Sequence, residues 1–173
     1  MSDRIAVMNE GVVEQVAEPE QVYDRPATTF VAGFIGVSNL MPGQVQKPGH
    51  EGEVELDAGV SVRASVDGFR AGERCHAVVR PEKLEIRFAE DGADIELPNV
   101  EGIVESSLYL GTATQIVVRL PDNVAMTVLV ANTDEDERQR LPGGGARVRL
   151  FWTPDYMHVV RESPENRQGG EES

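Results

Sequence analysis

This sequence of 173 residues has a single cysteine and no long apolar run, and each absence excludes a class of protein. One cysteine, Cys75, excludes an internal disulfide framework and a cysteine-based zinc cluster. Because Cys75 alternates with Ala77 and Val79, we expect a buried and inert thiol. No apolar run approaches the roughly 20 residues that cross a bilayer, and the N-terminus lacks a signal-peptide pattern. The sequence therefore predicts a cytoplasmic protein.

Positive charge and aromatic residues are also scarce. Lys and Arg number 16 against 30 Asp and Glu, which gives a formal net charge of −14. Binding a nucleic acid normally requires clustered Lys and Arg, or aromatic platforms with basic residues between them. Arg138, Arg140, Arg147 and Arg149 are close in sequence, but we interpret them as a solvated strand face and helix end. We therefore expect no nucleic-acid partner.

No motif for catalysis or metal binding is present. His50, His76 and His158 lie far apart without ligand spacing, so we predict no metal site. Residues 143–145 are three glycines, but Ala146-Arg147 follows them where a phosphate-binding loop needs Lys and then Ser or Thr. We interpret the glycines as a flexible turn. No carboxylate pair has an apolar setting that would raise a pKa, so we expect no enzyme site.

Residues 100–130 predict three consecutive β-strands, joined by turns at Leu110-Gly111-Thr112 and Pro121-Asp122-Asn123. Successive side chains of a strand point to opposite faces, so residues of one parity can cover a core. The three sets are Val100, Gly102, Val104, Ser106, Leu108 and Leu110; Thr114, Ile116, Val118 and Leu120; and Val124, Met126, Val128 and Val130.

Short strands between Gly, Pro and Asp turns continue this pattern from Asn39 onward, which indicates an all-β barrel or sandwich. Residues 132–140 carry acids first and arginines last, which suits one or two helical turns. The last ten residues are polar, and we predict them to be disordered.

The first 36 residues differ from the rest. Residues 4–8 and 12–16 predict a β-hairpin, and Pro19 can begin a short helix. Thr28 or Thr29 can cap a second helix that places four apolar residues on one side: Phe30, Val31, Phe34 and Ile35. Such a segment buries too little surface to fold alone, and its strands have edges open to another chain.

Residues 2–36, SDRIAVMNEGVVEQVAEPEQVYDRPATTFVAGFIG, resemble the C-terminal end of an ABC transporter ATPase domain of the maltose/polyamine import type. Residues 39–160 resemble the transport-associated OB (TOBE) domain that follows it in that family. The residues that carry the second resemblance are Val79-Arg80-Pro81-Glu82, Gly102-Ile103-Val104, Tyr109-Leu110-Gly111, Asn132, Leu150-Phe151-Trp152 and Pro154. Ser38-Asn39 and Tyr109-Leu110-Gly111 are more similar to the polyamine and ferric-iron branch.

The resemblance implies a mainly β fold, an OB-like TOBE barrel preceded by a β-hairpin and two short helices. It divides the chain into an ATPase-domain remnant at residues 1–36, a TOBE domain at 37–163 and a disordered tail at 164–173. The family's Walker A, Walker B, signature and switch-histidine positions have no counterpart here. We therefore expect a C-terminal fragment or the product of a split gene. It would hold no cofactor itself, since ATP and magnesium belong to the complete ATPase.

The implied function is that of a non-catalytic accessory or regulatory domain of an importer for polyamines or ferric iron. Its partners would be a second copy bound through the barrel, an ABC ATPase half and permease subunits, at the cytoplasmic face of the cell membrane. The resemblance suggests contact residues for the barrel, the dimer or a ligand: Asn39, Arg80, Glu82, Tyr109, Gly111, Thr114 and Asn132. The alternative is a free-standing OB-like module that binds a polyamine or an oxyanion.

Overall fold

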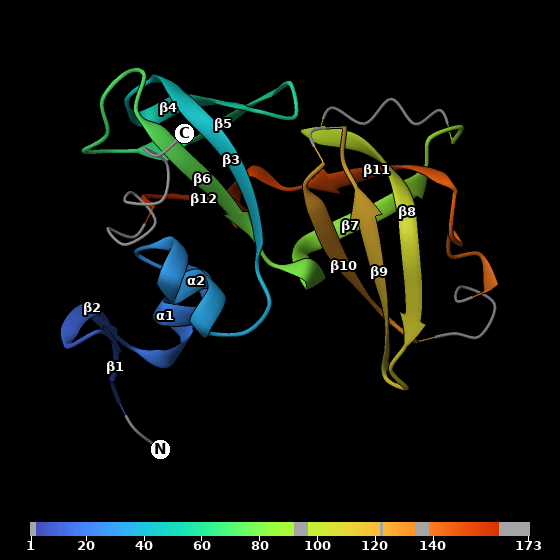
Figure 1. The fold of residues 1–173 in the computed structure, drawn as a ribbon, viewed down its shortest axis with the longest axis horizontal. Coiled ribbons are helices and arrows are strands. Elements are labelled where there is room, and N and C mark those ends of the chain that lie inside the picture. The colour runs from blue at the N-terminus through green and yellow to red at the C-terminus, as the bar shows by residue number, and fades with distance from the viewer. Residues whose placement is uncertain (1–2, 92–96, 122, 134–138, 163–173) are drawn as a thin grey trace, which may run out of the picture.

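The computed structural model describes residues 3–91, 97–121, 123–133 and 139–162. Its N-terminal segment begins with the predicted hairpin, in which strands β1 (Ile5–Asn9) and β2 (Val12–Ala17) pair antiparallel (Figure 1). Gly11 adopts a φ of +83° in the tight turn between them, a conformation that glycine reaches without steric cost. The hairpin forms a separate two-stranded sheet.

Two short helices follow the hairpin, as the sequence predicts: α1 (Pro19–Asp24) and α2 (Thr29–Phe34). Thr28 is the N-cap of α2, and its hydroxyl accepts a hydrogen bond from the backbone N–H of Val31 at 3.4 Å. The apolar side of α2 differs from the prediction because Phe34 is largely exposed and stacks on Phe30. Neither helix, within the described part of the chain, is long and apolar enough to cross a bilayer.

The N-terminal segment has a small core of its own and a second apolar contact with the rest of the chain. Val7, Val22 and Val31 bury one another between the hairpin and the helices. Ala32 of α2 packs instead against Val78 and Val160 of the first large sheet. The segment is therefore packed against the β-rich part of the chain.

The first large sheet has five antiparallel strands in the order β12-β6-β3-β4-β5 (Figure 1). Buried and more exposed positions alternate along β3 and the second half of β4, where the buried apolar side chains are Met41, Val45, Val54 and Leu56. The strands are β3 (Asn39–Lys47), β4 (Gly49–Leu56), β5 (Val60–Val66), β6 (Arg74–Val79) and β12 (His158–Val160).

The second large sheet also has five antiparallel strands, in the order β10-β9-β8-β11-β7. Two one-turn 3-10 helices lie at the crossings between the sheets: η1 (Pro81–Lys83) and η2 (Pro154–Tyr156). The strands are β7 (Leu84–Phe88), β8 (Asn99–Tyr109), β9 (Ala113–Arg119), β10 (Ala125–Ala131) and β11 (Arg147–Trp152).

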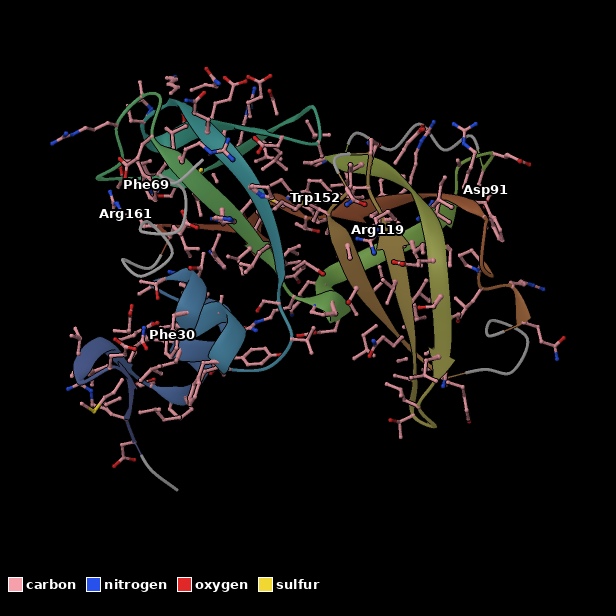
Figure 2. The ribbon with its side chains drawn as sticks, viewed as in Figure 1. Phe30, Phe69, Asp91, Arg119, Trp152 and Arg161 are labelled. Carbon is pink, nitrogen blue, oxygen red and sulfur yellow. The ribbon has the colours of Figure 1, made fainter. Side chains whose placement is uncertain are left out.

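Buried side chains of both sheets form one continuous hydrophobic core. Trp152, at the end of β11, is among its largest members and lies at the junction of the two sheets (Figure 2). The predicted mainly β, OB-like fold is confirmed. The division of its strands between two five-stranded sheets is new information from the structure.

One of the three predicted core faces is wrong in its second half. The faces of β9 and β10 are correct, since Ile116, Val118 and Met126 are buried. In β8, however, the register with β9 shifts between Val104 and Ser106, which marks a β-bulge. An extra residue reverses the faces beyond it, and residues of both faces are exposed from residue 105 to residue 112, so Leu108 and Leu110 are exposed rather than buried.

Two predictions concern parts of the chain that the structure does not describe fully. The helical turns expected at residues 132–140 fall largely on residues 134–138, which lie outside the described residues. The tail expected at residues 164–173 lies outside them entirely. The predicted boundary at residues 36 and 37 falls between α2 and β3, where the chain passes from the N-terminal segment to the first large sheet.

Candidate functional site

Arg80 joins the N-terminal segment to the sheets. Its side chain is only 4% exposed, and its guanidinium lies 4.0 Å from the ring centroid of Tyr23. Nη1 donates to the carbonyl oxygen of Ile35 at 2.8 Å, and Nε donates to that of Tyr23 at 3.1 Å. The same guanidinium also donates to the carbonyls of Ala32 and Val37 and to the hydroxyl of Ser38. We call this arrangement the Arg80 clasp.

The local sequence explains why Arg80 can reach both helices. Pro81 starts η1 directly after β6, so Arg80 stands at the end of a strand with an extended backbone. Its acceptors are carbonyls at or just beyond the last turns of α1 and α2, where helices leave carbonyl oxygens without intrahelical partners. A cation is also stabilised at that end, because the helix dipole is negative there. Burial lowers the pKa of Arg80, but a guanidinium remains protonated.

Glu82 completes the clasp. The Tyr23 hydroxyl donates a hydrogen bond to Glu82 Oε1 at 2.9 Å, so the tyrosine that stacks on Arg80 is also held at its far end. Burial, followed by the hydrogen bond and charge of Glu82, raises the pKa of Tyr23 above its ordinary value. Arg80 and Glu82, two of the predicted contact residues, therefore act together on one partner.

Arg161 forms a second connection to the N-terminal segment. Its carbonyl oxygen accepts from the backbone N–H of Thr29 at 3.2 Å, where α2 begins. Its guanidinium lies 4.1 Å from the Phe69 ring centroid, and its Nε donates to Glu73 at 2.9 Å (Figure 2). The backbone N–H of Arg70, together with Arg161, holds the pKa of Glu73 below its ordinary value.

Asn39 joins the two large sheets. It stands at the start of β3 and is 3% exposed. Its Nδ2 donates to the carbonyl oxygen of Thr127 in β10 at 2.7 Å, and its Oδ1 accepts from the N–H of the same residue at 2.7 Å. The side chain thus pairs with a backbone unit 88 positions away and satisfies two polar groups that β10 would otherwise leave unpaired.

Gly111, Thr114 and Asn132 meet at the tip of the β8–β9 hairpin. Gly111 has a φ of +87°, which the tight turn requires and glycine permits. Thr114 donates through its hydroxyl to Asn132 Oδ1 at 2.7 Å, and Asn132 Nδ2 donates to the Gly111 carbonyl at 2.8 Å. Tyr109 lies beside this network and is largely exposed. These contacts hold the hairpin tip in one conformation.

The seven predicted residues therefore lie in three places and do not line a common cavity. Arg80 and Glu82 join the segment to the sheets, Asn39 joins the sheets, and the other four residues shape the hairpin tip. A cavity of about 910 Å³ contains none of them. Its lining has mixed charge: Arg25, Lys47, Arg63, Glu51, Glu53 and Asp155. Among the residues described, no three His, Cys, Asp or Glu side chains form a potential metal site.

The sequence analysis did not identify Tyr23, Ser38 or Arg161 as contact residues. Tyr23 lies in the resembling stretch at residues 2–36, and Ser38 lies in the pair Ser38-Asn39 that is similar to one branch of the family, so the resemblance could have indicated both. Nothing in the sequence indicated Arg161, because its partners Phe69 and Glu73 are about 90 residues away.

Comparison with known proteins agrees with this arrangement. Residues 77–160 match the TOBE domain family, and they include Arg80, Glu82 and the whole second large sheet. A solved structure with a similar fold is the cytoplasmic molybdate-binding protein ModG with molybdate bound, at a TM-score of 0.59 and 18% identity. The similarity covers 71% of this chain and 96% of that protein, which supports the OB-like fold. Residues 77–160 thus belong to the TOBE domain family.

The relatives in sequence are more specific. The spermidine/putrescine import ATP-binding protein PotA of Thermobifida fusca (strain YX) is 38% identical over 92% of this chain. The protein of the same name from Rubrobacter xylanophilus is 40% identical, also over 92%. The chain belongs to this family of ABC importer ATP-binding proteins and corresponds to the end of the ATPase domain plus the TOBE domain. It spans 41% of the length of either relative.

Proposed function

We propose that the chain is the non-catalytic accessory and regulatory part of an ABC importer for polyamines. The relatives that bear the name spermidine/putrescine import protein favour polyamines over ferric iron. The observation that carries the proposal is the Arg80 clasp, because it links the segment that resembles the ATPase end to the TOBE domain. A buried guanidinium with three acceptors on that segment, and two more at Val37 and Ser38 just beyond it, allows little independent movement.

This connection suggests how regulation works. A displacement of α1 and α2 on the ATPase side moves the carbonyls that Arg80 contacts, and β6 moves with Arg80. Asn39 then passes the displacement from β3 to β10 and so to the second sheet. The same path carries a signal in reverse, since coupling between two sites is reciprocal.

The exposed apolar side chains of the N-terminal hairpin suggest where the chain binds a partner. Four of its apolar side chains are exposed, and the register places three of them, Met8, Val13 and Val16, on one face and Val12 on the other. An exposed apolar face on a two-stranded sheet is typical of a surface that another element covers. We assign this face to the ATPase half of the importer. The complete assembly would include permease subunits and a second copy of this chain, at the cytoplasmic face of the membrane.

The proposed role excludes ATP hydrolysis by the chain itself. ATP and magnesium would bind in the remainder of the family's ATP-binding protein, and this chain would supply no catalytic group. An ATPase assay on the purified chain with magnesium tests this statement against a heat-denatured sample. We expect equal phosphate release from both, and turnover above the denatured control would overturn the non-catalytic assignment.

The alternative is a free-standing module that binds a small ligand. Its acidic composition favours a cation such as a polyamine over an oxyanion. Isothermal titration with spermidine, putrescine and molybdate separates the two roles. Saturable binding of one of them by the isolated chain would favour the module, whereas an accessory domain gives no heat of binding.

A further inference from the structure

The two large sheets share one arrangement of strands. Each contains three consecutive strands, β3-β4-β5 in the first sheet and β8-β9-β10 in the second, and β6 or β11 lies beside the first of the three. Each of these neighbours then leads through a 3-10 helix, which begins at Pro81 or Pro154, into a strand of the other sheet. β7 and β12 therefore occupy equivalent positions, each at one edge of its sheet.

The edge strands of each sheet border a cavity. In the first sheet, β5 and β12 contribute to the lining of the cavity of about 910 Å³. In the second sheet, a cavity of about 530 Å³ is lined by residues 84–86 of β7 and 129–131 of β10, with Leu141 and Trp152 among the other lining residues. We call this second cavity the β7–β10 groove. Among the described strands, β7 pairs only with β11 and β10 pairs only with β9.

Backbone hydrogen-bonding groups of β7 face the β7–β10 groove. The N–H and C=O groups of an antiparallel strand point alternately to its two sides. The N–H of Ala89 donates to the carbonyl oxygen of Arg147, beside β11, at 3.0 Å. Glu85 and Arg87 have the same parity and also face β11, so the N–H and C=O of Ile86 point to the open edge. An edge of this kind is a template for another strand.

The edge of β10 at the groove has the same property. The Asn132 N–H donates to the Thr112 carbonyl oxygen at 2.9 Å, so even-numbered residues of β10 face β9. Thr127 faces the other way, where Asn39 hydrogen-bonds to both its N–H and its C=O. Leu129 has the parity of Thr127, so its N–H and C=O also point to the edge that borders the groove. Asn39 thus covers one edge residue of β10, and Leu129 is the next along that edge.

The first sheet shows how the equivalent edge is covered. The extended backbone of Thr28 forms a parallel bridge with Arg161, directly beyond β12. The Thr29 N–H donates to the carbonyl oxygen of Arg161 at 3.2 Å. A strand-like stretch of the N-terminal segment therefore occupies this edge. Figure 1 shows that the segment lies beside the first sheet and away from the second, where the groove borders the equivalent edge of β7.

We propose that an extended peptide of a partner protein binds in the β7–β10 groove and pairs with the free edge of β7. Such strand addition obtains its affinity from backbone hydrogen bonds and its specificity from alternate side chains. The occupied edge of β12 provides the example within this molecule. A strand that runs opposite to β7 also runs opposite to β10, because these two edge strands have the same direction.

The lining of the groove selects the side chains of that peptide. Alternate side chains of the peptide point into the cavity, whose walls include Ile86, Leu129 and Leu141. We therefore expect apolar residues at every second position. The remaining positions suit basic rather than acidic residues, because the chain carries a formal net charge of −14. Two of the three charged lining residues are also acidic: Glu82, Lys83 and Glu85.

Fluorescence anisotropy with the labelled peptide KVTVKVTVK, at chain concentrations from about 1 µM to about 1 mM, tests the proposal. We expect saturable binding and a change in the fluorescence of Trp152, the single tryptophan, which lines the groove. N-methylation of the valines, or of the threonines and the inner lysine, removes the N–H donors of one peptide edge. At least one of these two peptides should bind at least about tenfold more weakly. The acidic peptide EVTVEVTVE should also bind at least about tenfold more weakly.

Substitutions in the chain test the same edge. Ile86→Pro removes the N–H that faces the groove, at a position where an edge strand tolerates proline, and should weaken peptide binding at least about tenfold. The matched control is Val159→Pro at the equivalent position of β12, which should leave binding unchanged. Circular dichroism checks that both variants fold. In the wild-type chain, the Ile86 amide should exchange more slowly once the peptide is added, whereas the Arg87 amide faces β11 and should be protected in both states.

The outcomes that would overturn the proposal are distinct. Absence of saturable binding at the highest concentration excludes the peptide partner. Binding that neither N-methylated peptide weakens would depend on charge and not on backbone pairing. Full binding by a folded Ile86→Pro chain, or equal loss of binding in Val159→Pro, excludes the groove as the site. Unchanged exchange of the Ile86 amide with saturating peptide excludes it without any substitution.

Discussion

Replacing Arg80 by methionine removes the guanidinium and keeps most of the apolar stem. Five groups lose a donor: the carbonyls of Tyr23, Ala32, Ile35 and Val37 and the Ser38 hydroxyl (all contacted by Arg80). Hydrogen bonds to charged groups contribute about 1.5–3 kcal/mol each. Water can replace the guanidinium as the donor to some of these acceptors. Loss of only two of the hydrogen bonds without such replacement already costs about 3–6 kcal/mol.

Backbone hydrogen exchange in α1 and α2 measures this loss where it occurs. We expect the opening free energy of both helices to fall by the same 3–6 kcal/mol, roughly. If the whole chain unfolds together, the melting temperature should fall by roughly 10 °C. Arg87→Met is the matched control, because Arg87 pairs with Glu85 on the surface and should cost no more than about 1 kcal/mol. Equal effects of the two substitutions would refute the clasp.

Three further predictions concern other parts of the chain. Asn39→Ala leaves the N–H and carbonyl of Thr127 without their partner. It should lower the free energy of unfolding, measured by urea titration, by about 2–4 kcal/mol. The control is Gln46→Ala, which removes an exposed hydrogen bond and should change the free energy of unfolding little. Burial raises the pKa of Cys75 to about 11. At about pH 8 a thiol reagent should therefore react with Cys75 only after denaturation. Rapid reaction with the native chain would contradict the buried position of this thiol. Burial lowers the pKa of His76, so the unfolded chain binds more protons than the folded chain as pH falls through about 6.5. The free energy of unfolding should therefore be fully present above about pH 7 and decline below it. His76→Asn should make that decline with pH less steep.

The local elements were predictable because they depend on neighbours in sequence. Alternation identified the buried faces of β9 and β10, and Thr28 was among the expected caps of α2. The bulge in β8 was not predictable, since an unbroken alternation of side chains gives no sign of an inserted residue. Beyond the bulge the described residues of both faces are exposed as far as residue 112, which the alternation also did not indicate.

The contacts of the proposed site residues were not predictable from the sequence. Resemblance selected Asn39 and Arg80, whereas only the folded chain shows that Asn39 contacts a residue 88 positions away and that Arg80 contacts both helices. A buried asparagine and a buried arginine are each costly unless paired, but a sequence does not identify the partner.

Uptake of radiolabelled spermidine by cells that produce this protein tests the proposed function most directly. The compared strains carry the wild-type chain, the Arg80→Met variant or a deletion, with uptake of an unrelated solute as the control. An accessory domain of a polyamine importer predicts reduced spermidine uptake in both altered strains and unchanged uptake of the control solute. Spermidine uptake at the wild-type rate in the deletion strain would contradict that assignment.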